Sequence, residues 1–152
     1  MAVWLMKSEP DEFSINDLKH RQHENWDGVR NFQARNFMRQ MMLGDTVLFY
    51  HSSCKTPAIV GTATVSKTAH PDPSCWNSES KYFDEKSTPE KPRWDQIELT
   101  FAGKLKRPIT LAVLKAMPEL DGFALLQKGS RLSVMPVDEL YWHTIKEKML
   151  FE

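Results

Sequence analysis

The chain has 152 residues, of which 41% are hydrophobic and 26% are charged, so its length and composition are those of one ordinary globular domain. Twenty basic residues balance twenty acidic ones, and this neutrality excludes a function that depends on general attraction to phosphates, which needs an excess of positive charge. Two cysteines indicate no disulfide framework, and we expect no signal peptide or membrane span at the start. We therefore expect a reduced, cytoplasmic protein without a membrane partner.

Short apolar runs and capping residues predict an alternation of strands and helices. Strands are expected over residues 3–6, 46–51, 58–66, 96–101 and 131–135. Helices are expected over residues 15–19 with Ser14 as the cap, over 32–42 with Asn31 as the cap, before Pro118 with Thr110 as the cap, and after Pro136. The predicted fold class is α+β with a curved mixed sheet or a small barrel, because strands this short would leave exposed edges in an open sheet.

Two segments are periodic enough to predict which side chains face the core. Residues 96–101 alternate strictly between apolar and polar side chains, so Ile97 is expected to face the core and Gln96 the solvent. The last helix is expected to bury one apolar face that includes Leu140 and Ile145.

Residues 67–93 form the longest segment without periodicity. Four prolines interrupt this segment, yet it contains Trp76, Tyr82 and Phe83, and aromatic residues are uncommon in disordered chains. Loops of this length inside a compact domain are usually functional. We therefore expect the segment to fold back over a binding site.

Motifs of the common enzyme classes are absent: the chain has no G-x-S-x-G, H-E-x-x-H, P-loop or G-x-G-x-x-G sequence. We therefore expect a protein that is not an enzyme and that needs no cofactor. His51, Cys54, His70 and Cys75 have the chemistry of zinc ligands, but their spacing is irregular, and ordinary reduced thiols are the favoured interpretation. Accordingly, no metal site is expected.

Four of the seven arginines lie between residues 21 and 39, beside a Trp-Asp-Gly turn. Trp26 and Trp76 lie in polar loops, where a large aromatic ring either fills the scaffold or stacks on a ligand, and the sequence leaves both interpretations open. The other three tryptophans lie in predicted strands or helices and are expected to pack in the core. Arg30 is expected to pair with Asp27 within the turn.

Seven motifs occur in order between residues 4 and 137, and together they resemble the EVE domain family. The motifs are WLMKSEPDEFSI, NWDGVRNFQARNFM, GDTVLFYHSS, IVGTATV, PRWDQIEL, LKRPITLAVLK and KGSRLSVMPV. This resemblance covers nearly the whole chain and implies a single PUA-like domain over residues 1–152, a small and mostly antiparallel β-barrel flanked by short helices. The chain lacks the long basic N-terminal extension of the eukaryotic nuclear members, so it looks like a bacterial stand-alone form.

EVE domains are related to YTH domains, which hold a methylated adenine in an aromatic cage, and the resemblance implies a base pocket of the same kind. Trp26 and Trp76 match the two cage walls. The full set of expected pocket residues is Trp26, Trp76, Ser8, Asn31, Tyr50, His51, Ser52, Ser130 and Leu132. The candidates for contacts with phosphates and the nucleic-acid backbone are Lys7, Arg35, Arg39, Lys104, Lys106, Arg107 and Arg131.

These residues and the resemblance lead to one hypothesis about function and two alternatives. The hypothesis is a non-catalytic nucleic-acid-binding domain that captures a single flipped base of DNA or RNA, carrying a modification such as a methyl group, in the aromatic pocket. The first alternative is a binder of a small nucleotide or nucleoside, or an enzyme that acts on one. The second alternative is a protein-interaction module that uses the loop over residues 67–93.

Overall fold

The computed structural model describes all 152 residues and contains one six-stranded sheet and four α-helices. The strands are β1 (Val3–Ser8), β2 (His23–Trp26), β3 (Thr46–His51), β4 (Ala58–Pro71), β5 (Asp95–Thr110) and β6 (Val134–Pro136). The helices are α1 (Ile15–Arg21), α2 (Phe32–Gln40), α3 (Leu111–Lys115) and α4 (Glu139–Lys146). Three short 3-10 helices lie in the connections: η1 (Pro73–Cys75), η2 (Pro118–Leu120) and η3 (Ala124–Leu126). None of the helices is long and apolar enough to cross a membrane.

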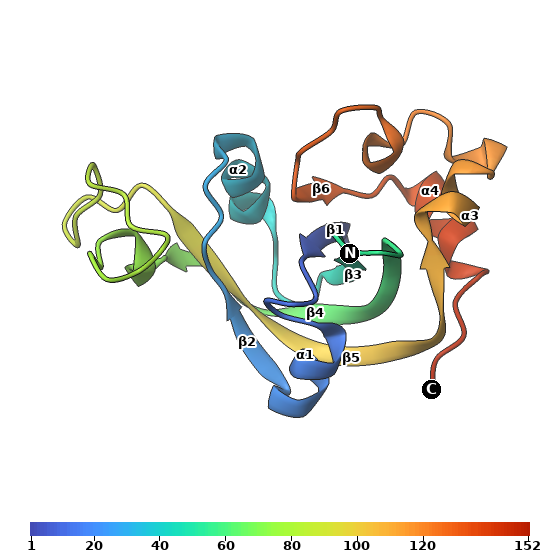
Figure 1. Cartoon of the computed structure of the whole chain (residues 1–152), viewed down its shortest axis with the longest axis horizontal. Helices are drawn as coiled ribbons and strands as arrows, with labels where there is room; N and C mark the ends of the chain where they lie inside the picture. Colours follow the sequence, from blue (N-terminus) through green and yellow to red (C-terminus); the bar gives the residue numbers. More distant parts are fainter.

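The strands follow the order β2-β5-β4-β3-β1-β6, and every neighbouring pair is antiparallel except β1 with β3. The two longest strands, β4 and β5, have 14 and 16 residues. Their pairing shifts register at four places, and such irregularities bend strands and increase their twist. In Figure 1, β4 and β5 sweep across the sheet, and β5 curves from the long loop at one end to α3 at the other. The α+β class, with a mostly antiparallel sheet flanked by short helices, is confirmed.

Side-chain caps set the starts of all four α-helices, and three of these caps were predicted. The Asp17 backbone N–H donates to Ser14 Oγ at 3.1 Å, and the Ser14 backbone N–H donates to the Asp17 carboxylate at 2.8 Å, so α1 begins at a capping box. The Ala34 N–H donates to Asn31 Oδ1 at 2.9 Å at the start of α2, and Thr110 caps α3 in the same way. All three predicted caps are confirmed.

The sheet is covered on both faces and therefore has two hydrophobic cores. On β3, Val47 and Phe49 belong to one core while Leu48 and Tyr50 belong to the other, as the alternation of side chains along a strand requires. Residues of α1 and α2 complete the first core, and residues of α3, α4 and the 3-10 helices between them complete the second. Four consecutive buried residues confirm that β3 is the predicted central strand.

Several local predictions differ from the structure. The short edge strand β2 was not predicted, because its sequence HENW contains a single apolar residue. Strand β4 extends to Pro71 instead of ending at residue 66, so the loop covers residues 72–94 and not 67–93. Strand β6 covers only Val134–Pro136, whereas a strand was predicted over residues 131–135. Gln96 was expected to face solvent, but it is only 7% exposed because its amide bonds to His70 on β4. Leu140 is 76% exposed, since α4 packs on the core through the side of the helix that carries Ile145.

Candidate functional site

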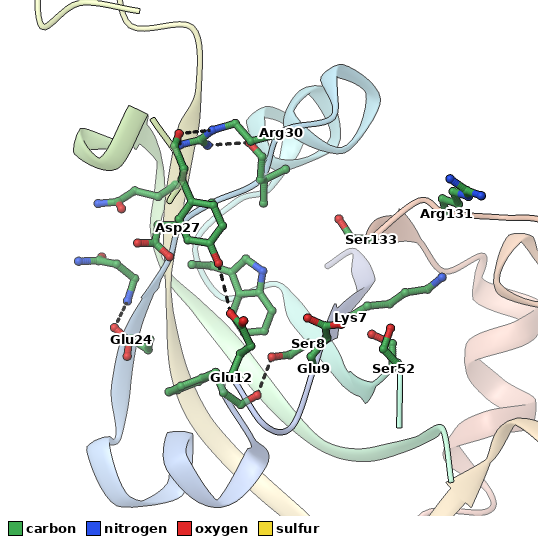
Figure 2. Close-up of a pocket in the computed structure, with 18 of the residues that line it drawn as sticks. Lys7, Ser8, Glu9, Glu12, Glu24, Asp27, Arg30, Ser52, Arg131 and Ser133 are labelled. Atoms are coloured by element: carbon green, nitrogen blue, oxygen red, sulfur yellow. Dashed lines mark hydrogen bonds between the residues drawn. The ribbon is translucent and has the colours of Figure 1, made fainter. Parts of the chain in front are cut away.

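A cavity of about 940 Å³ opens between the turn after β2 and the adjacent ends of β1 and β3. Figure 2 shows its lining side chains converging from several elements. They fall within residues 7–13, 21–30, 52–53 and 130–133, with Pro73, Tyr82 and Gln96 from the loop and the start of β5. The fold thus brings together residues that are far apart in the sequence.

One side of the cavity exists because β1 and β3 are parallel, so that their carboxyl ends meet at the same edge of the sheet. The Ser52 N–H donates to the Ser8 carbonyl at 2.9 Å just beyond the last paired residues. Ser8 Oγ donates to the carbonyl of Phe13 at 2.5 Å, which ties the β1–α1 turn to this edge. The Lys7 N–H donates to the Ser133 carbonyl at 2.9 Å, which brings in the segment before β6.

Trp26, the last residue of β2, supplies an aromatic surface to the cavity. Its indole packs edge-on against the ring of Phe49, with centroids 5.4 Å apart and planes at 84°, and against Phe13 at 6.2 Å and 87°. Edge-to-face contacts of this kind are favourable and hold a ring in one orientation. The half-buried indole is therefore fixed by the core while it lines the cavity.

The turn after Trp26 depends on Gly28. Its φ is +76°, a left-handed conformation that other residues adopt at a cost. A Cβ atom at residue 28 would lie 2.6 Å from Cζ of Tyr82, so only a glycine leaves room for the tyrosine ring against the turn. Tyr82 consequently lines the cavity as a second aromatic residue near Trp26.

Arg30 joins this turn to the loop over residues 72–94. Its Nη1 donates to Oδ2 of Asp72 at 3.1 Å and its Nη2 to Oγ of Ser74 at 3.1 Å, while Nε and Nη2 donate to the Tyr82 carbonyl at 2.9 and 2.8 Å. The guanidinium carbon lies 5.6 Å from the centre of the Tyr82 ring and 5.5 Å from that of Trp94. Arg30 therefore orders the loop. The expected pairing with Asp27 was wrong, because the partner is the fully buried carboxylate of Asp72.

Asp27 is the free carboxylate of the turn. It is exposed at the cavity wall, and its side chain makes no hydrogen bond to another residue. Partial burial of the carboxyl group raises its pKa above the usual range, and the nearby negative charge of Asp72 raises the pKa further. The cavity wall thus offers a carboxylate to which no other residue donates.

Two cations without an ion pair lie across the cavity from three of its four carboxylates. Figure 2 shows Lys7 and Arg131 on one side, with Glu12, Glu24 and Asp27 on the other. Neither cation on the first side takes part in an ion pair. Burial lowers the pKa of the Lys7 amine. The first side can therefore receive an anion, and the second can receive hydrogen-bond donors.

The family model described as "EVE domain" matches residues 2–148, which is nearly the whole chain. The chain belongs to the EVE domain family. It is 38% identical to thymocyte nuclear protein 1 of Homo sapiens over 155 residues, a match that covers 90% of this chain and 68% of that protein. It is also 38% identical to the Gallus gallus protein of the same name, with 90% and 64% covered. This EVE domain thus spans about two thirds of the length of these relatives.

Solved structures are also similar to this EVE domain. A crystal structure of a Pseudomonas syringae protein matches it with a TM-score of 0.95 at 50% identity, covering 98% of this chain and 100% of that one. The crystal structure of the human THYN1 protein in complex with DNA containing 5-methylcytosine matches with a TM-score of 0.93 at 36% identity, covering 97% of both chains. The fold described above is therefore the fold of these proteins.

Some of the residues predicted for the site lie at the cavity of this EVE domain. They are Lys7, Ser8, Trp26, Ser52, Ser130 and Arg131. These residues come from the parallel ends of β1 and β3, from the end of β2, and from the segment that leads into β6. The fold brings these four parts of the chain together, although they are far apart in the sequence.

The other predicted pocket residues lie outside the lining, because the fold uses them elsewhere. Asn31 caps α2, and half-buried Trp76 ends η1. Tyr50 is only 3% exposed in the second core, where burial raises its pKa to about 12. His51 Nε2 accepts the first N–H of α1 at 3.1 Å, and burial lowers the pKa of this ring. Leu132 packs against both cores.

Five of the seven predicted phosphate contacts also lie outside the lining: Arg35, Arg39, Lys104, Lys106 and Arg107. Arg39 Nε donates to the Asp95 carboxylate at 2.5 Å, and Arg35 donates to the Arg93 carbonyl at 2.8 Å. Burial lowers the pKa of Arg35, and the positive charge of Arg39 lowers it further. Lys104 lies 3.6 Å from the carboxylate of the last residue. Arg35, Arg39 and Lys104 therefore have intramolecular partners.

Fifteen of the 21 lining residues were not among the predicted site residues, and they include Phe13, Asp27, Tyr82 and Gln96. Tyr82 was recognised as an aromatic residue of a loop expected to cover a site, but nothing in the sequence favoured it over Trp76. The alternating pattern assigned Gln96 to the solvent. Asp27 could have been found from its position in the Trp-Asp-Gly turn.

The four residues with zinc-ligand chemistry do not come together. No group of three or more His, Cys, Asp or Glu side chains has the arrangement of a metal site. Both cysteines are free thiols, with Cys75 buried and Cys54 partly buried, and His70 is hydrogen-bonded to Gln96.

Proposed function

We propose that this EVE domain is a non-catalytic nucleic-acid-binding domain that takes one flipped base, 5-methylcytosine or a base of similar modification, into the cavity beside Trp26. The observation that carries the proposal is the match, over 97% of both chains, to human THYN1 in complex with DNA containing 5-methylcytosine. The cavity volume of about 940 Å³ lies within the range of roughly 300–1,000 Å³ that small-ligand sites occupy. It has room for a base with its sugar and phosphate.

The aromatic lining supplies the stacking energy that a flipped base needs. Removing a base from a duplex costs a few kcal/mol, and stacking on an aromatic side chain returns about 1–3 kcal/mol per base. These terms nearly cancel, so hydrogen bonds and the modification decide which base is bound. A buried methyl group adds about 0.8 kcal/mol, or about fourfold in affinity, so the methyl group alone gives modest discrimination.

In this proposal Lys7 and Arg131, which have no ion-pair partner, bind the sugar-phosphate backbone. Lys7 and Arg131 lie on the side of the cavity opposite Glu12, Glu24 and Asp27, and neither is engaged by a protein carboxylate. With two phosphate contacts, log K should fall with log salt at a slope of about −2. Such a shallow slope suits a chain without net charge, since general binding to unmodified nucleic acid is then weak.

Binding of short DNA and RNA oligonucleotides with one 5-methylcytosine or one cytosine, measured by fluorescence anisotropy across a salt series, tests the proposal. Lys7→Ala and Arg131→Ala should each reduce the salt slope by about one, whereas Arg107→Ala on the far part of β5 should leave it unchanged. If modified and unmodified oligonucleotides bind with equal affinity, and a free nucleoside competes as well as an oligonucleotide does, a small-ligand site would instead be favoured.

A further inference from the structure

Gln96 is the one polar residue of the cavity lining that is more than nine-tenths buried, with 7% of its surface exposed. Its Nε2 lies 3.1 Å from His70 Nε2, and His70 Nδ1 lies 2.8 Å from the carbonyl oxygen of Thr68. A carbonyl oxygen only accepts, so Nδ1 carries the proton of the neutral ring and Nε2 accepts from the Gln96 amide. The orientation of the amide is thereby set. Its carbonyl oxygen and its second N–H have no protein partner and are free for a ligand.

Asp27 lines the same cavity as this amide. Trp26 pairs with Ile97 at the last position of the β2–β5 ladder, and continuing that register by one residue would set Asp27 opposite Gln96. Gln96 in turn pairs with His70 across the β5–β4 ladder. His70 on β4, Gln96 on β5 and Asp27 in the turn after β2 are thus aligned in one row, and alternation turns this row away from the face on which the Trp26 indole packs.

A free carboxylate and an oriented amide make a subsite that is separate from the aromatic surface. The Asp27 carboxylate offers two acceptor oxygens, and Gln96 offers one acceptor and one donor. The Watson–Crick edge of guanine complements this set, because two adjacent N–H groups, N1–H and N2–H, stand beside the carbonyl O6. Thymine and uracil present a single N–H between two carbonyl groups, so one carbonyl would face the carboxylate.

We propose that Asp27 and Gln96 form a second subsite of the cavity, which binds the Watson–Crick edge of a guanine adjacent to the captured base. This inference rests on the proposed function. Asp27 accepts from N1–H and N2–H, and the free N–H of Gln96 donates to O6. His70 is a positioning residue, since it holds the other N–H of the amide. The subsite makes recognition depend on the neighbour of the modified base as well as on the base itself.

The test uses single-stranded oligonucleotides in which 5-methylcytosine is flanked, on either side in turn, by guanine, inosine, adenine or thymine. Inosine is guanine without the N2 amino group, so it removes one hydrogen bond without any change in the protein. One good base contact discriminates by about tenfold. We expect guanine to bind about tenfold more tightly than inosine or thymine on one flank, and equally on the other.

Protein variants assign that preference to residues. Gln96→Leu and Asp27→Asn should reduce the preference for guanine over adenine, which lacks N1–H and O6, to about twofold or less, while binding of the adenine oligonucleotide stays within twofold of that of the parent protein. His70→Phe should have the same effect, and His70→Gln, which retains an acceptor, should restore the preference. The exposed Gln33 of α2 provides the matched control, and Gln33→Leu should change nothing. Thermal unfolding of each variant verifies that it is folded.

The outcomes distinguish failure of the guanine subsite from failure of the proposed function. Binding that requires Trp26 but treats all flanking bases alike overturns the subsite and leaves the captured-base function standing. A change in selectivity for the captured base in Gln96→Leu places Gln96 in the main pocket and also overturns the subsite. Failure to bind any modified oligonucleotide overturns both proposals.

Discussion

Arg30 and Asp72 form an ion pair of 3.1 Å in which the carboxylate is fully buried. The same oxygen of Asp72 also accepts the Gly28 N–H at 2.9 Å. One carboxylate atom thus binds the turn after β2 at two points and ties it to the start of the loop over residues 72–94. Since Tyr82 lies on that loop, the aromatic lining of the cavity depends on this pair.

Replacing Asp72 with Asn should destabilise the protein strongly. The substitution preserves shape but leaves the mostly buried Arg30 guanidinium without its counter-charge, and removing one partner of a buried pair costs about 3 kcal/mol or more. Urea unfolding measures this change. Asp11→Asn, at an exposed position without a hydrogen bond, is the control. Equal unfolding free energies for the two variants would show that the pair does not hold the loop.

Gly28→Ala should destabilise the fold more than Gly129→Ala does. Both glycines have positive φ, +76° and +77°, so both substitutions carry a conformational cost of about 1–2 kcal/mol. A Cβ at residue 28 additionally meets the Tyr82 ring, whereas nothing lies within 4 Å of one at residue 129. Thermal unfolding gives the difference, and oligonucleotide affinity should fall only for Gly28→Ala. Equal stability and equal affinity of the two variants would show that contact with the Tyr82 ring is not the reason for a glycine at residue 28.

Trp26→Ala should weaken binding of a modified oligonucleotide by about tenfold, because one stacking contact is lost. Trp26→Phe retains an aromatic face and should recover most of the affinity. Trp76→Ala should stay within twofold, since Trp76 is not part of the cavity lining. Circular dichroism verifies the fold of each variant. A loss of the same size in Trp76→Ala would instead restore Trp76 as the second cage wall.

Asp27→Asn should raise the melting temperature at neutral pH and lose this advantage in acid. The folded protein raises the pKa of Asp27, first through burial and then through Asp72, so ionisation of Asp27 disfavours the folded state. This penalty is present above the folded-state pKa, declines as pH falls through it, and is gone below the unfolded-state pKa. Melting temperatures of both proteins across this range test the sign. If the higher melting temperature of Asp27→Asn persisted unchanged in acid, ionisation of Asp27 would not be its cause.

The predictable features of the fold have local causes. The capping side chains of Ser14, Asn31 and Thr110 lie next to the N–H groups they bond, and the apolar run of β3 is itself the consequence of burial on both faces. Strand β2 has no such signal, because it is held by its ladder to β5 and not by its own apolar pattern.

The candidate site was only partly predictable, because tertiary contacts decide which side chains reach it. Arg30 and Asp72 are 42 residues apart, and no spacing in the sequence pairs them. That pair determines which aromatic residue of the loop lies beside Trp26. Gln96 likewise obeys an alternating pattern that predicts exposure, and only the neighbouring strand with His70 buries it.

The separation of charge across the cavity has a consequence for direction. Of the four cations that line it, Arg21 and Arg30 are paired with carboxylates, and only Lys7 and Arg131 have no ion-pair partner. Under the proposed function, these two cations would draw the phosphates of a bound strand to one side of the cavity. A strand bound in this way would lie asymmetrically about the captured base, so the domain would contact the phosphates on one side of that base more than those on the other.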